Sequence, residues 1–166
     1  MAANDQKQFA ISRTFNAPRD LVWKAWTEAE RLAQWWGPKG SGIKVKALDF
    51  RAGGMFHYSM TAPNGQIWWG RFAYREIEKP NRIVFVSSFS DEAGGVSRAP
   101  FSPIWPLEVL NDLRFTEQDG KTTVSLRGGP LNATEEEREM FEGMFDSMKQ
   151  GFGGTFDQLE DYLANN

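Results

Sequence analysis

The segment from Thr134 to Leu163 constrains the fold more than any other part of the chain. Its large apolar side chains recur at spacings of three and four residues, which is the period of an amphipathic helix. Thr134 and Glu137 form a capping-box pattern at its start. The sequence therefore predicts one long helix that buries an apolar face against the rest of the chain. That face consists of Phe141, Phe145, Met148, Phe152, Phe156, Leu159 and Leu163, with Met140 and Met144 on one flank.

Glycines occur within this helix without interrupting its apolar period. A glycine in a helix interior costs about 1 kcal/mol relative to alanine. We therefore expect a single helix, with any bend at Gly151, Gly153 and Gly154, and not two helices. Gly143, Ser147, Gly151 and Gly154 form a stripe of small residues beside the Phe/Met face. This stripe has two interpretations: close packing of the helix on a sheet, or room for a ligand.

The residues before this helix predict an antiparallel sheet. Residues 8–15 alternate apolar and polar side chains, as a strand does. A helix follows Pro18, and a second short helix is expected over 28–34. Further strands are predicted at 43–50, 55–61, 66–77, 82–89, 107–116 and 121–127, with a bulge at Gly70. Short turns join most of these strands, so neighbours pair antiparallel, and the separate helices and strands indicate the α+β class.

Composition narrows the classes of protein that this chain represents. With 166 residues, the chain is expected to form one domain, 1–166, whose core spans about 8–163. A net charge of −3 argues against a nucleic-acid partner. The absence of cysteine excludes disulfides and thiol chemistry. We expect no membrane span and no signal peptide, hence a cytoplasmic protein. The aromatic content of 14%, with seven Trp and thirteen Phe, indicates an aromatic core or a ring-lined cavity.

Four segments together resemble a known family. They are Phe15 to Pro18 with Val22 to Thr27, Leu32 to Pro38, Arg51 to Gly54 with Phe56 and Met60, and Gly151-Phe152 with Leu159 and Leu163. The chain is similar to the START-like (SRPBCC) helix-grip superfamily, in the branch named for the activator of the heat-shock protein 90 ATPase (AHSA-type). Phe152 stands where the family usually has tryptophan.

The resemblance implies a curved antiparallel sheet of six or seven strands that grips the C-terminal helix, with two short helices after the first strand. It also implies a cavity between sheet and helix. Such domains act as binders of hydrophobic ligands, as cyclases or related enzymes, or as chaperone partners in the stress response. Fold alone does not decide among these.

The expected ligand-binding residues are large rings, methionines and one helix glycine. They are Trp23, Trp36, Phe56, Tyr58, Met60, Trp68, Phe72, Phe85, Phe89, Phe101, Trp105, Met144, Met148, Gly151 and Phe152. An ordinary packed core is the competing interpretation. Polar candidates on the strands are Arg71, Tyr74, Ser87, Glu108, Asn111, Asp112 and Arg114, and a shift of one residue in register decides which of them face inward. The connection 90–106 is expected either to cap the cavity or to pack on the surface.

Strand alternation places His57 opposite Phe56, Tyr58 and Met60, so we expect a surface histidine that faces away from the cavity. A single histidine and no cysteine leave no convincing catalytic triad and no metal site. We therefore expect no catalytic residue, no metal and no cofactor. The leading hypothesis is a monomer or homodimer that binds a small hydrophobic molecule. The alternatives are a cyclase or dehydratase acting on a polyketide-type substrate, and a partner of a heat-shock ATPase.

Overall fold

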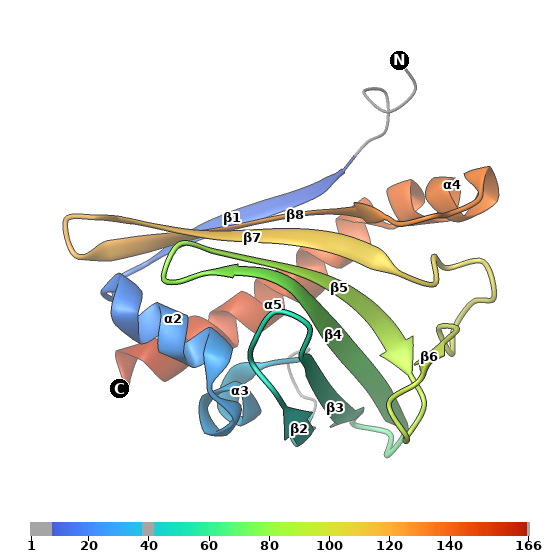
Figure 1. Cartoon of the computed structure of the whole chain (residues 1–166), viewed down its shortest axis with the longest axis horizontal. Coiled ribbons are helices and arrows are strands. Elements are labelled where there is room, and N and C mark those ends of the chain that lie inside the picture. The colour runs from blue at the N-terminus through green and yellow to red at the C-terminus, as the bar shows by residue number, and fades with distance from the viewer. Residues whose placement is uncertain (1–7, 38–41, 166) are drawn as a thin grey trace.

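The structure is a computed structural model that describes residues 8–37 and 42–165. One curved antiparallel sheet forms the body of the molecule, in the order β1-β8-β7-β5-β4-β3-β2, and β6 pairs with β5 (Figure 1). The strands are β1 (Phe9–Phe15), β2 (Gly42–Leu48), β3 (Met55–Thr61), β4 (Ile67–Glu78), β5 (Arg82–Ser90), β6 (Val96–Ser97), β7 (Val109–Gln118) and β8 (Lys121–Pro130). The helices are α2 (Arg19–Thr27), α3 (Ala29–Trp35), α4 (Glu135–Gly143) and α5 (Phe145–Ala164). The predicted α+β class is confirmed.

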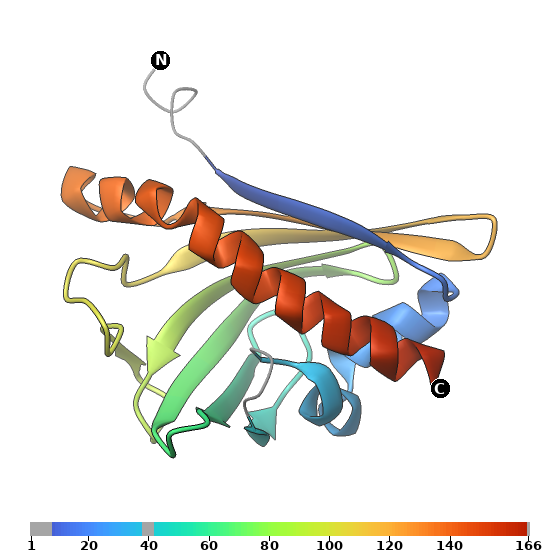
Figure 2. The same ribbon diagram turned by 180° about the vertical axis from the view of Figure 1, so that it is seen from behind.

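The long helix α5 crosses one face of the sheet diagonally, and α2 and α3 lie beside its C-terminal end (Figure 2). Its C-terminal half is tightly packed, because Phe156 and Leu159 have no exposed surface. Fully burying a side chain of this size contributes about 2–3 kcal/mol. Polar contacts fix the same end: Arg13 on β1 pairs with Asp157 at 2.7 Å. This end of α5 is therefore the anchored part of the gripped helix.

The prediction of one helix over residues 134–163 is wrong in one detail, because the helix is divided at Met144. Met144 has φ −101° and ψ 7°, so the α-helical geometry ends at Gly143 and resumes at Phe145. The helix instead continues without a break through Gly151, Gly153 and Gly154. The predicted capping box is present, with the Glu137 N–H donating to Thr134 Oγ1 at 3.1 Å.

The glycine in β4 does not form the predicted bulge. Gly70 pairs in register with Tyr58 on one side and Phe89 on the other, and the irregularity of β4 lies between Tyr74 and Glu76. The segment Gly128 to Pro130 also differs from the prediction, since it extends β8 beyond residue 127. The strand β6 was missed because two residues carry no detectable alternation.

His57 faces away from the helix, as strand alternation predicts, but it is not a surface residue. Only 4% of it is exposed. A tight turn over residues 91–95 folds back over it, and His57 Nε2 lies 3.2 Å from the carbonyl oxygen of Asp91. Arg71 and Lys46 donate to two further carbonyls of the same turn, those of Gly94 at 2.8 Å and Glu92 at 3.1 Å. The turn is therefore held by three side chains of the outer sheet face.

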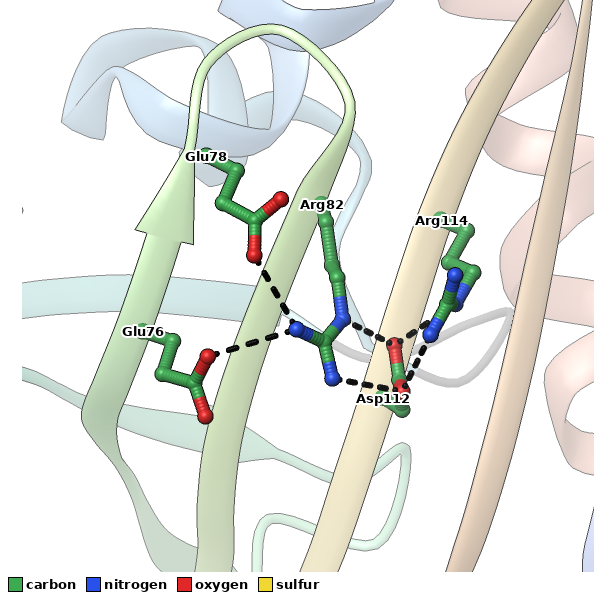
Figure 3. A network of polar contacts seen from close by, with 5 residues as sticks. All are labelled: Glu76, Glu78, Arg82, Asp112 and Arg114. Atoms are coloured by element: carbon green, nitrogen blue, oxygen red, sulfur yellow. Dashed lines mark hydrogen bonds and ion pairs between the residues drawn. The ribbon is translucent and has the colours of Figure 1, made fainter.

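A second polar group on the sheet joins three neighbouring strands (Figure 3). Arg82 on β5 donates to both carboxylate oxygens of Asp112 on β7, each at 3.1 Å, and also reaches Glu76 and Glu78 on β4. Partial burial raises the pKa of Asp112, but hydrogen bonds from Arg82 and Arg114 outweigh burial and leave this pKa below its usual range. These residues tie the strands together and do not face the helix layer.

Candidate functional site

Two adjoining hollows lie between the sheet and the N-terminal half of α5. The inner hollow is the more enclosed and measures about 240 Å³, while the outer hollow measures about 340 Å³. Residues on β1, β3, β4, β5, β7 and β8 contribute to the inner hollow, together with α2, α4 and α5. The connection between β5 and β7 contributes to both. The residues that line both hollows are Trp36, Tyr58, Met60, Phe89, Trp105, Met148 and Phe152.

Most of the ring-rich set predicted from the sequence comes together around these hollows. The members that line one or both are Trp36, Tyr58, Met60, Phe72, Phe85, Phe89, Phe101, Trp105, Met144, Met148, Gly151 and Phe152. The structure also brings in residues that the sequence did not single out as lining: Phe9, Trp26, Val109, Leu126 and Phe141. Phe9, Val109 and Leu126 lie on strands and Trp26 and Phe141 on helices, and their meeting depends on long-range packing that local patterns do not reveal.

Three predicted residues lie outside the lining. Trp23 is buried in the core, where its ring meets Phe115 at a centroid distance of 5.2 Å. Phe56 is fully buried and stacks on Tyr58 at 4.7 Å. Trp68 lies 6.1 Å from Phe89, a lining residue. Phe56 and Trp68 thus pack against residues of the lining, whereas Trp23 belongs to the neighbouring core.

The helix glycines do not mark close packing of the helix on the sheet. A methyl group placed on Gly151 meets no atom within 4 Å, and the same holds for Gly143. Gly151 and Ser147 line the outer hollow, whereas Gly143 lines neither. The stripe of small residues therefore leaves open space at the mouth of the site.

Helix α5 itself positions Trp36 at the centre of the lining. The Gln158 amide donates to the carbonyl oxygens of Trp35 and Gly37, at 3.0 and 2.8 Å, and Thr155 Oγ1 donates to Gly37 O at 2.9 Å. The backbone on both sides of Trp36 is therefore fixed to the helix. Its ring packs edge-on to Phe72 at 5.2 Å.

Tyr58 supplies a hydroxyl to the lining of both hollows. Burial raises the pKa of Tyr58 to about 12, and the indole N–H of Trp36 offsets a little of that rise. The hydroxyl is therefore protonated at neutral pH. The Trp36 N–H lies near this hydroxyl, and among the described residues it has no partner at hydrogen-bonding geometry.

Among the polar candidates, the structure places Ser87 and Asn111 in the inner hollow. Tyr74 is buried in the core against Phe50, at a centroid distance of 5.0 Å. Arg71 bonds to the 91–95 turn of the outer face. Glu108 lies outside the lining, as do Asp112 and Arg114 of the strand-linking network. Alternation in β7 is the reason: Asn111 faces inward, so Asp112 and Arg114 face outward.

The connection 90–106 reaches the mouth through its apolar residues. Trp105 lines both hollows, and Phe101 lines the outer one although 46% of it is exposed. Arg98 fixes this segment to α4, since its Nη1 donates to Glu137 Oε2 at 2.5 Å and to the Trp105 carbonyl at 3.3 Å. The Thr134 N–H and then Arg98 hold the pKa of Glu137 below its usual range.

The described side chains that line the two hollows are uncharged. Within residues 8–37 and 42–165, no Asp, Glu, His, Lys or Arg side chain contributes to either hollow. The same residues hold no group of three His, Cys, Asp or Glu side chains suited to a metal ion. In this described part of the chain, no helix is long and apolar enough to cross a membrane. The site can thus enclose an apolar molecule and offer it a few neutral polar groups.

Comparisons with known proteins agree with this architecture. A protein from Mycobacterium smegmatis has a similar structure, with 26% identity, a TM-score of 0.77, and coverage of 96% of this chain and 91% of that one. A protein from Arthrobacter aurescens is 23% identical and superposes with a TM-score of 0.80. The match covers 98% of this chain and 88% of the Arthrobacter chain. An AHSA1 protein from Silicibacter pomeroyi is 19% identical and superposes with a TM-score of 0.71. The match covers 95% of this chain and 98% of the Silicibacter chain. No curated protein matches the sequence.

The family comparison covers most of the chain. The model of the Activator of Hsp90 ATPase homolog 1-like proteins matches residues 16–164, which include all the helices and every strand except β1. Apart from Phe15, this range contains the four segments on which the resemblance was based. The chain therefore belongs to the family of Activator of Hsp90 ATPase homolog 1-like proteins, within the START-like helix-grip superfamily.

Proposed function

We propose that this chain binds a small apolar or aromatic molecule in the inner and outer hollows, between the sheet and α5. The observation that carries the proposal is unfilled space with an uncharged, ring-rich lining. Cavities that bind small molecules measure about 300–1,000 Å³ and are mostly apolar. The side chains of the sheet and α5 leave this space open, whereas an ordinary core is close-packed.

Affinity in such a site comes mainly from removing apolar surface from water, at about 25 cal/mol per Å² before the costs of association. The predicted ring residues Trp36, Phe72 and Phe85 offer faces and edges for aromatic contacts. Fixed aromatic side chains lose little entropy when a ligand binds. No covalent step is required for this function.

Filling the outer hollow from the helix tests the proposal. Gly151→Phe places a ring where a methyl group meets no atom within 4 Å, so the protein is expected to fold and to lose binding. Gly143→Phe is the matched control, because that helix glycine is equally unobstructed but lies outside the lining. Binding is measured with Nile red, a neutral apolar dye, and folding by circular dichroism.

Equal dye binding by the two glycine variants and the unmodified protein would refute the proposed site. Met148→Trp provides a second filling variant, since Met148 lines both hollows. If both filling variants unfold while the Gly143 control folds, the space is packed core and the proposal fails. Native mass spectrometry of the purified protein, before and after denaturing extraction, identifies a co-purified molecule by its mass.

The other two candidate functions make different demands. A cyclase or dehydratase needs an acid or base that faces its substrate, and the described lining offers the neutral groups Tyr58, Ser87 and Asn111. We therefore rank ligand binding above catalysis. The family's name supports a second candidate, a partner of a heat-shock ATPase. Stimulation of the purified ATPase by this chain, saturable with concentration, is the result expected from that function.

A further inference from the structure

The inner hollow contains a polar pair on its sheet side, the buried Asn111 and the half-buried Ser87. Asn111 on β7 is 7% exposed, and its amide nitrogen donates to Ser87 Oγ at 2.9 Å and to the Val109 carbonyl at 3.0 Å. Both amide hydrogens of Asn111 are therefore used. This bonding fixes the orientation of the amide and leaves its oxygen, Oδ1, as the group with spare capacity.

Two complementary groups remain free in this pair. Within the described residues, no donor bonds to Asn111 Oδ1. In the described part of the chain, the Ser87 hydroxyl accepts from Asn111 and has no acceptor for its own proton. Both residues line the inner hollow, so both groups are available to a molecule bound there. An acceptor and a donor thus lie next to each other on a wall that is otherwise almost entirely apolar.

A glycine on the next strand makes room for this pair. Gly128 on β8 lies opposite Asn111 in register, and a methyl group at position 128 would lie 2.8 Å from Asn111 Oδ1. Glycine inside a strand weakens the strand and often marks a close approach. Gly128 and Asn111 both line the inner hollow. The open space beside the amide oxygen therefore depends on the absence of a side chain at this position.

The charge of the lining limits what this pair can recognise. Burying an ionised carboxylate without a partner is expensive, and the described lining provides no cation. A hydroxyl group uses both free groups, because it donates to Asn111 Oδ1 and accepts from the Ser87 hydroxyl. A carbonyl uses only Ser87, and a hydrocarbon uses neither.

We propose that the inner hollow recognises the hydroxyl group of a neutral ring-bearing molecule, through Asn111 Oδ1 and Ser87 Oγ. This inference rests on the proposed function and names the chemical class of its ligand. The rings of the ligand lie among the aromatic residues, and its hydroxyl reaches the pair on β5 and β7. Because hydrogen bonds to protein replace hydrogen bonds to water, their net contribution is modest, and the hydroxyl is expected to improve affinity about tenfold.

The experiment compares three probes of equal ring size by isothermal titration calorimetry at neutral pH: naphthol, methylnaphthalene and naphthoate. Naphthol is expected to bind about tenfold more tightly than methylnaphthalene, and naphthoate most weakly. Ser87→Ala is expected to lower the affinity for naphthol several-fold and to leave that for methylnaphthalene unchanged. Ser125→Ala is the control, because Ser125 is a half-buried strand serine outside the lining and should change neither affinity.

The outcomes separate this inference from the proposed function. If naphthol and methylnaphthalene bind equally to the unmodified protein, or Ser87→Ala leaves their ratio unchanged, recognition of a hydroxyl is refuted while apolar binding stands. If naphthoate binds most tightly, the requirement for a neutral ligand is wrong. If no probe binds, both proposals fail. Asn111→Leu provides a second variant if Ser87→Ala does not fold, and it should abolish the preference for naphthol in the same way.

Discussion

Gly70 provides a direct test of how the sheet makes room for a lining side chain. It lies opposite Tyr58, and a methyl group at position 70 would lie 2.6 Å from the Tyr58 hydroxyl oxygen, 2.7 Å from Cζ and 3.1 Å from Cε2. Contacts this short force the tyrosine ring to move. The ring is buried and stacked on Phe56 at 4.7 Å, so it cannot move without disturbing its neighbours.

Two opposing effects determine the stability of Gly70→Ala: overpacking of the site lowers it, and the loss of a strand glycine raises it. Overpacking of a buried site costs about 1–3 kcal/mol, while replacing a strand glycine by alanine contributes about 0.5–1 kcal/mol. We expect a net loss of about 1–2 kcal/mol in the free energy of unfolding. In a domain of this size, each kcal/mol lowers Tm by about 2–4 °C. Urea unfolding followed by circular dichroism measures the change, with an unaltered slope indicating two-state behaviour.

Gly129→Ala is the matched control for this prediction. Gly129 is also a strand glycine, but a methyl group there meets only Gln8 Cγ at 3.7 Å, which is ordinary contact. We expect this variant to be as stable as the unmodified protein or slightly more stable. Equal stability of Gly70→Ala and Gly129→Ala would refute the argument that Tyr58 requires glycine opposite it. Tyr58→Leu, which removes the obstructing atoms, should make Gly70→Ala harmless.

Four further predictions concern two ion pairs, the mouth of the site and metal binding. The pKa of Glu137 in the folded protein lies below its ordinary value of 4.5, so the stability that this residue contributes is complete above pH 4.5 and is lost as pH falls through the folded pKa. In Glu137→Gln, Tm should therefore depend less on pH in this acid range. Arg82→Met removes the ion pair with Asp112 and should lower the free energy of unfolding at low salt. The loss should be smaller in 1 M salt, where charges are screened over about 3 Å. Urea titrations at both salt concentrations test this. If the connection 90–106 covers the mouth of the site, saturating Nile red should slow proteolysis within this connection. Cleavage at an unchanged rate would contradict the idea that the connection covers the mouth. Stoichiometric zinc should leave Tm unchanged, because the described residues hold no metal-binding group.

Local patterns in the sequence predicted the elements that depend on neighbouring residues. The capping box at Thr134 and Glu137 forms in both directions, at 3.1 and 2.9 Å, because its atoms are three residues apart. Strand alternation correctly placed Tyr58 and His57 on opposite faces. It did not predict that His57 is buried, since its cover is a turn more than thirty residues away in the sequence, as the bond to Asp91 shows (separation 34).

The candidate site was predictable in type but not in its polar details. Aromatic content and helix periodicity pointed to the rings that meet between sheet and helix. Recognising that Asn111 and Gly128 lie opposite each other requires the register of β7 against β8, which a single sequence does not specify. The break at Met144 was missed because the apolar period continues across it, while the helical dihedrals do not.

The packing of α5 is uneven along its length. Phe156 and Leu159 are fully buried at one end, whereas Met148 and Gly151 border open space at the other. Substitutions at the open end remove little buried surface, so their effect on the free energy of unfolding is small. The shape and polarity of the hollows can therefore change by point mutation while the fold is retained, which makes this architecture readily evolvable.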